Sequence, residues 1–151
     1  MSEIFNPYDY TESERLTKIG RDKEHTVKDL IDAVNHYELY CTKEMLRFII
    51  DNPDQINGCG RKGEEFPNTN YGLFIGWACF LHDAQWGVAK TITDLEIGNM
   101  NFRSNLDIII EIESCCTFMK WMRGYRVRSY YNGVQYVGLP QEIKRRGFGN
   151  D

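Results

Sequence analysis

A histidine and an aspartate stand side by side at positions 82 and 83, in the segment WACFLHDAQWG. Neighbouring residues on a helix point about 100° apart, so His82 and Asp83 cannot share one proton, but they can reach one reaction centre from two sides. The carboxylate can bind a hard cation such as Ca²⁺, and the imidazole can take a proton from a nearby water. The alternative is an exposed edge of a core helix without any chemistry.

A glycine-rich segment, NGCGRKGEEFPNTNYG, precedes this pair. Its glycines at 58, 60, 63 and 72 and its proline at 67 exclude a stable helix and suit a loop with positive φ angles. A phosphate-binding loop would need a preceding strand and a Ser or Thr after the lysine, and Lys62 is followed by glycine. We therefore expect the loop to turn backbone carbonyls toward a hard cation.

Helices are the elements that must position these groups, and the chain is predicted to be mainly α. Apolar spacing predicts a helix from Thr26 to about Tyr37, a second one after Thr42 that ends at Asn52-Pro53, and a third over 72–89. A later helix is expected to run through Phe102 as far as Met119, and a last one from about Trp121. A short hairpin is expected only in GVQYVGL, near the C-terminus.

Asn99 lies on the apolar stripe of the later helix, three residues before Phe102 and seven before Leu106. A buried amide needs an internal hydrogen-bond partner, so we expect the Asn99 side chain to be satisfied within the fold.

These motifs, NGCG-x-x-G, an aromatic-Gly pair and AC-x-x-HD-x-x-aromatic, resemble the phospholipase A₂ family, especially its compact prokaryotic and phage-encoded group. The resemblance covers about residues 41 to 139. It implies two long antiparallel helices preceded by the glycine-rich loop, with residues 1–40 as a helical N-terminal extension to a domain of residues 41–151. It also implies hydrolysis of the sn-2 ester of glycerophospholipids.

The resemblance assigns roles to individual residues. His82 matches the general base of the family, and Asp83 matches its calcium ligand. The carbonyls of Gly58, Gly60 and Lys62 match the loop ligands of Ca²⁺. Two supporting positions depart from the family. Asn99 replaces the aspartate that orients the histidine, and Trp86 replaces a tyrosine whose hydroxyl bonds that aspartate. The resemblance therefore implies that Asn99 meets the far ring nitrogen of His82. An amide can accept the histidine N–H, but it brings no negative charge to stabilise an imidazolium, so a slow or inactive enzyme is expected.

The five cysteines are odd in number and include the adjacent pair Cys115 and Cys116, which we expect to be small core residues. We predict that all five are reduced. The N-terminus lacks the apolar stretch of a signal peptide, and no run of about 18 apolar residues can span a bilayer. We therefore expect a cytoplasmic protein, in a host cytoplasm or a virion if the chain is phage-encoded.

Charge is unevenly distributed, since residues 120–151 carry seven Lys and Arg against two acidic residues in a chain of net charge −4.

The motifs and this charge together lead to three hypotheses. The motifs suggest a calcium-dependent phospholipase that works at a phospholipid surface, or an inactive relative that serves as a phage structural or interaction protein. The basic C-terminal segment suggests a nucleic-acid-associated protein. A solvated basic face is the simpler explanation of the charge, so nucleic acid is not expected as the partner.

Overall fold

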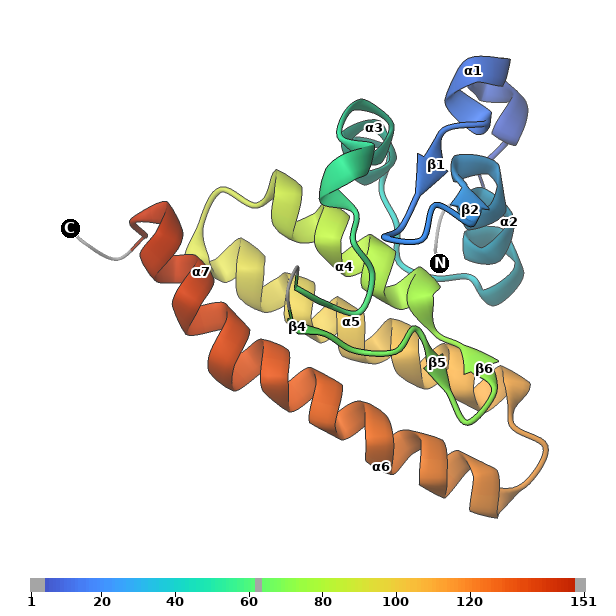
Figure 1. Cartoon of the computed structure of the whole chain (residues 1–151), viewed down its shortest axis with the longest axis vertical. Coiled ribbons are helices and arrows are strands. Elements are labelled where there is room, and N and C mark those ends of the chain that lie inside the picture. The colour runs from blue at the N-terminus through green and yellow to red at the C-terminus, as the bar shows by residue number, and fades with distance from the viewer. Residues whose placement is uncertain (1–4, 62–63, 149–151) are drawn as a thin grey trace.

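The computed structural model describes residues 5–61 and 64–148. Helices dominate the structure (Figure 1), which confirms the predicted mainly helical class. They are α1 (Glu12–Arg15), α2 (Val27–Tyr37), α3 (Lys43–Asp51), α4 (Gly76–Val88), α5 (Ile92–Glu113), α6 (Thr117–Gly133) and α7 (Leu139–Arg146), with the 3₁₀ turns η1 (Pro7–Asp9) and η2 (Pro53–Gln55) and the π-helical turn η3 (Val134–Gly138). No helix of the described residues has the length and apolar character needed to cross a membrane.

Strands are short and lie between the helices. Antiparallel pairing joins β1 (Lys18–Ile19) to β2 (His25–Thr26), β3 (Gly60–Arg61) to β4 (Glu64–Glu65), and β5 (Thr69–Asn70) to β6 (Leu73–Phe74). These pairs shape the connections and build no continuous sheet in the described part of the chain.

Side-chain caps fix the starts of the main helices. Thr26 and Asp29 form a reciprocal capping box at α2, and Thr91 and Asp94 form another at α5. The hydroxyl of Thr42 accepts from the backbone N–H of Met45 at the start of α3. The helix starts predicted at Thr26 and after Thr42 are therefore confirmed.

Helices α4, α5 and α6 run side by side, each antiparallel to the next, with α5 between the other two (Figure 1). Helix α3 packs against α4, and α2 contacts both α4 and α5. One apolar cluster contains buried residues from both sides of position 40, among them Ile19 and Leu30 before it and Leu81 and Leu106 after it. The division into an extension and a domain stays a prediction.

Three local predictions are wrong. The third helix begins at Gly76, because the β5–β6 hairpin occupies the preceding residues. The later helix ends at Glu113, and Cys115 and Cys116 lie exposed in the break before α6. The segment GVQYVGL is helical, because Leu139 packs against Ala89 and Leu95 and this contact outweighs the local β propensity.

The C-terminal helix is tied across the end of α4. The Arg146 guanidinium donates to the carbonyls of Trp86 at 2.6 Å and Ala89 at 2.9 Å. Trp86 lies in the last turn of α4 and Ala89 is the C-cap, so Arg146 supplies donors where the carbonyls of a helix have few partners. Helix α7 therefore lies beside the helix that carries His82.

Arg123 joins α6 to two other parts of the fold. Its guanidinium donates to the carbonyl of Tyr71 at 3.0 Å, to Ser114 Oγ at 3.0 Å and to the carbonyl of Glu113 at 3.3 Å. The buried Asn70 amide donates to the Arg123 carbonyl at 2.9 Å. One side chain therefore fixes the β5–β6 turn and the end of α5 to α6.

We expect Arg123→Met to lower the free energy of unfolding by about 2 kcal/mol, because it keeps the apolar stem but leaves these acceptors without their donor. Urea denaturation measures the change. Arg128→Met, on the exposed face of the same helix, is the matched control and should change stability by less than about 0.5 kcal/mol. Equal losses in the two variants would contradict the role given to Arg123.

Candidate functional site

His82 and Asp83 line a cavity of about 500 Å³ between the glycine-rich loop, α4, α5 and the C-terminal helical segment. Its size is typical of a small-molecule site. The polar part is formed by His82, Asp83, Gly58 and Gly60, whereas apolar side chains form most of the remaining surface. These are Phe66, Trp86, Phe102, Val134 and Val137, with Gln141, Glu142 and Arg145 of α7 near them.

His82 is buried, with 7% of its surface exposed, between the rings of Trp86 and Phe102. Its Nε2 lies 2.8 Å from Asn99 Oδ1 on α5, so the predicted contact is present. Burial lowers the pKa of His82 to about 4, although the Asn99 hydrogen bond opposes this shift. The imidazole is therefore neutral at pH 7, and Nδ1 is the ring nitrogen left for chemistry.

Asp83 holds the glycine-rich loop against α4. Its Oδ2 accepts from the backbone N–H groups of Asn57 and Gly58, both at 3.0 Å. Burial raises the pKa of this carboxyl to about 7, and the two hydrogen bonds and the more distant Arg21 only partly counter it. A cation near the carboxylate would relieve the cost of this buried charge.

The loop conformation requires glycine at position 58. Gly58 has a φ of +111°, and a Cβ there would lie 2.8 Å from Asn68 Oδ1. That same oxygen accepts from the backbone N–H of Cys59 at 2.9 Å. The Gly60 carbonyl accepts from Asn57 Nδ2 at 3.0 Å, and its second lone pair can still bind a cation. The predicted ligand Lys62 lies outside the described residues.

The N-terminal part of the chain braces this loop. Arg21 donates from Nη1 to the Cys59 carbonyl at 2.8 Å, from its backbone N–H to the Asn57 carbonyl at 3.0 Å, and from Nη2 to the Phe66 carbonyl. These three acceptors are therefore turned toward Arg21. The candidate cation ligands Gly58 and Gly60 instead line the cavity.

A disulfide joins Cys59 of the loop to Cys79 of α4. The prediction that all five cysteines are reduced is therefore wrong for this pair. The loop folds back onto the helix and brings the two Cα atoms within 5.0 Å, which a count of cysteines cannot reveal. Because disulfides persist mainly in oxidising compartments, cysteine usage no longer supports a cytoplasmic location. Cys79 lies about one turn before His82, so the disulfide ties the loop to α4 beside the site.

Trp86 hydrogen-bonds to Leu95, and not to Asn99 as the resemblance implies for a tyrosine at this position. Its only polar ring atom, Nε1, donates to the Leu95 carbonyl at 3.0 Å. Gly98 permits the close approach, since a Cβ there would lie 2.8 Å from Trp86 Cδ1. Trp86 therefore packs α4 on α5 and covers the His82 ring, and its polar atom is not available to Asn99.

Gln135 is a site residue that sequence reasoning missed. Its Oε1 accepts from Asn99 Nδ2 at 2.8 Å. The sequence prediction placed Gln135 in a hairpin, whereas the π-helical turn η3 presents it to α5. No local motif in the sequence signals this contact.

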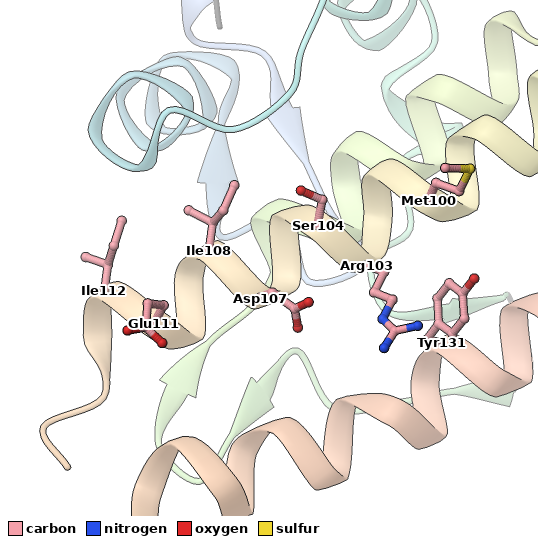
Figure 2. A pocket seen from close by; sticks show the side chains of 8 residues that line it. All are labelled: Met100, Arg103, Ser104, Asp107, Ile108, Glu111, Ile112 and Tyr131. Atoms are coloured by element: carbon pink, nitrogen blue, oxygen red, sulfur yellow. The ribbon is translucent and has the colours of Figure 1, made fainter. Parts of the chain in front are cut away.

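A second depression, of about 680 Å³, lies on the solvent side of α5 beside α6 (Figure 2). Arg103 and Asp107 extend from α5 toward α6, and the Arg103 guanidinium lies 5.3 Å from the centre of the Tyr131 ring. Arg103, Ser104 and Asp107 are exposed, and the lining includes neither a histidine nor a thiol. The cavity at His82 is therefore the better candidate for chemistry.

No family model, curated protein or solved structure significantly matches this chain. Among the described residues, no three His, Cys, Asp or Glu side chains are close enough together to hold a metal ion. A metal at this site would depend on Asp83, backbone carbonyls and water. Such all-oxygen ligands fit Ca²⁺ better than Zn²⁺.

We expect replacement of Cys59 and Cys79 by serine to lower the free energy of unfolding by about 3 kcal/mol, because the disulfide restricts the unfolded chain between positions 20 residues apart. Denaturant titration measures this loss. Replacement of the exposed Cys115 and Cys116 by serine is the control and should have little effect. Because Cys41 is buried, alkylation is done on the natural protein unfolded without reductant, and it should label Cys41, Cys115 and Cys116 only. Labelling of all five cysteines would contradict the disulfide.

The raised pKa of Asp83 predicts a pH-dependent stability. Between about pH 4 and pH 7 the folded state keeps a proton on Asp83 that the unfolded state has released, so this group makes the protein less stable as the pH rises. Asp83→Asn removes the effect, and its amide oxygen can still accept both loop N–H groups.

In calcium-free solution, we expect Asp83→Asn to gain stability relative to the natural protein by about 1.4 kcal/mol per pH unit across this window. His82 titrates in the opposite sense, but it is present in both proteins and cancels. Urea unfolding at several pH values measures the difference. A difference that stays constant from pH 4 to pH 7 would exclude a buried, protonated Asp83.

Proposed function

We propose that the protein is a calcium-dependent, phospholipase A₂-like hydrolase that cleaves the sn-2 ester of glycerophospholipids. The observation that carries this proposal is the grouping of His82, Asp83 and the glycine-rich loop around one largely apolar cavity. The resemblance of the motifs adds the substrate class, since a long apolar chain needs a cavity of this character.

In the proposed reaction, His82 acts as the general base. Its Nε2–H donates to Asn99, so the Nδ1 lone pair can take a proton from a water molecule in the cavity. That water attacks the ester carbonyl, and the products are a fatty acid and a lysophospholipid. Asn99 orients the imidazole but brings no charge to stabilise the imidazolium, so turnover should be slow.

Asp83 and the carbonyls of Gly58 and Gly60 would hold Ca²⁺. These are hard oxygen donors. The Asp83 carboxyl accepts from two backbone N–H groups, and among the described residues no cationic side chain is hydrogen-bonded to it to balance its charge. When bound, the cation would polarise the ester carbonyl and stabilise the charge that develops on its oxygen.

Apolar residues surround part of the cavity opening. Phe66 and Val137 line the cavity, yet they are 40% and 53% exposed, and the neighbouring Tyr136 is 73% exposed. Arg145 lies beside them on α7. Aromatic and aliphatic side chains next to a cation suit contact with a phospholipid surface, which is the proposed partner.

The second candidate is an inactive relative that keeps the fold as a phage structural or interaction protein. Two observations favour it. Asn99 supplies an amide where the family has a carboxylate, and Trp86 is hydrogen-bonded to Leu95 instead of supporting Asn99.

Vesicle hydrolysis distinguishes the two candidates. With Ca²⁺ present, we expect the natural protein to release fatty acid from the sn-2 position of phosphatidylglycerol vesicles, and a calcium chelator should stop this release. His82→Gln should lower the rate by about 10²- to 10⁴-fold, because it removes the base. Asn99→Asp should raise it, because a carboxylate stabilises the imidazolium.

His36→Gln is the matched control, since His36 is an exposed histidine on α2 and should not affect the rate. Release that is equal in the natural protein and in His82→Gln would contradict the assigned base. Absence of release from the natural protein and from Asn99→Asp would reject the hydrolase and favour the inactive relative.

A further inference from the structure

Three buried or half-buried side chains form a hydrogen-bonded row that starts at the cavity. Gln135 Oε1 accepts from Asn99 Nδ2 at 2.8 Å, and Asn99 Oδ1 faces His82 Nε2 at 2.8 Å. Asn99 has no exposed surface, so both ends of its amide depend on these partners.

The orientation of the Asn99 amide decides which ring nitrogen of His82 carries the proton. With Oδ1 toward the ring, Nε2 must be the donor, and Nδ1 keeps its lone pair. If the amide turned by 180°, Nδ2 would donate to Nε2, the proton would move to Nδ1, and no base would face the cavity. In the serine-protease triad, the wrong tautomer accompanies a loss of about 10⁴-fold in turnover.

An aspartate has two equivalent oxygens and cannot be misoriented in this way, but an asparagine can. Something else must fix the Asn99 amide. In the structure, Asn99 Nδ2 donates to the Gln135 carbonyl oxygen, and with the Gln135 amide in this orientation Asn99 Oδ1 is held toward the ring. Gln135 reaches α5 from the π-helical turn η3, whose adjacent residues Tyr136 and Val137 are exposed. Such turns are common at functional sites.

We propose that Gln135 is a positioning residue that fixes the Asn99 amide and thereby keeps His82 in the Nε2–H tautomer, with Nδ1 free as the base. The effect of Gln135 on turnover rests on the proposed hydrolase function, whereas its effect on the His82 tautomer does not depend on that function. Gln135 thus fixes the orientation of the Asn99 side chain, which an aspartate at position 99 would not require.

Nitrogen-15 NMR of the histidine rings measures the tautomer directly in the calcium-free protein. We expect Nε2–H in the natural protein and in Gln135→Glu, whose carboxylate accepts from Asn99 Nδ2 whichever way it turns. Gln135→Met keeps the length but removes the acceptor, so a mixed or Nδ1–H tautomer is expected. If Gln135→Met does not fold, Gln135→Asn shortens the reach and should have the same effect. Gln85→Met on α4 is the control.

Vesicle hydrolysis provides the second readout. Gln135→Met should lower kcat by about 10-fold or more, up to about 10⁴-fold, at unchanged KM, and Gln135→Glu should restore it. An unchanged Nε2–H tautomer in both Gln135→Met and Gln135→Asn would overturn the proposal. If neither the natural protein nor Asn99→Asp shows hydrolysis, the proposed function fails, and the NMR result alone decides the role of Gln135.

Discussion

The hydrogen bond between His82 and Asn99 constrains the site more than any other single contact. It joins two buried polar groups on neighbouring helices, and a buried polar group without a partner costs about 1–3 kcal/mol. Helices α4 and α5 must therefore pack in the register that brings these side chains together. The capping box at Thr91 and the contact of Trp86 with Leu95 lie close to the turn between the helices and support that register.

The same burial governs the charges of the site. The low pKa of His82 and the high pKa of Asp83 have one cause, which is removal from water, and in both groups it favours the neutral form. At neutral pH, without a cation, His82 is uncharged and the Asp83 carboxyl, with a pKa of about 7, is only partly ionised. A bound divalent cation would change this balance at Asp83, next to the imidazole. The loop supplies carbonyls for that purpose while its backbone N–H groups hold the carboxylate.

Local sequence signals predicted those parts of the structure that depend on neighbouring residues. The helix starts after Thr26 and Thr42 and the glycine-rich loop follow from caps and composition, whereas the pairing of His82 with Asn99 followed from the resemblance to the phospholipase A₂ family. Gln135 and the Cys59–Cys79 disulfide did not follow, because each joins segments whose distance is set by tertiary packing. The C-terminal hairpin was predicted wrongly for the same reason, since GVQYVGL is helical and its Leu139 packs against Ala89, after α4, and Leu95, near the start of α5.

The turn η3 serves two parts of the molecule at once. Val134, Val137 and Gly138 border the cavity, while Gln135 between them holds the Asn99 amide. Arg146 anchors the far end of this segment to the last carbonyls of α4. Any outward shift of the segment that widens the cavity must also withdraw Gln135 from Asn99. The width of the cavity and the orientation of the Asn99 amide beside His82 therefore both depend on the position of one turn, Val134–Gly138.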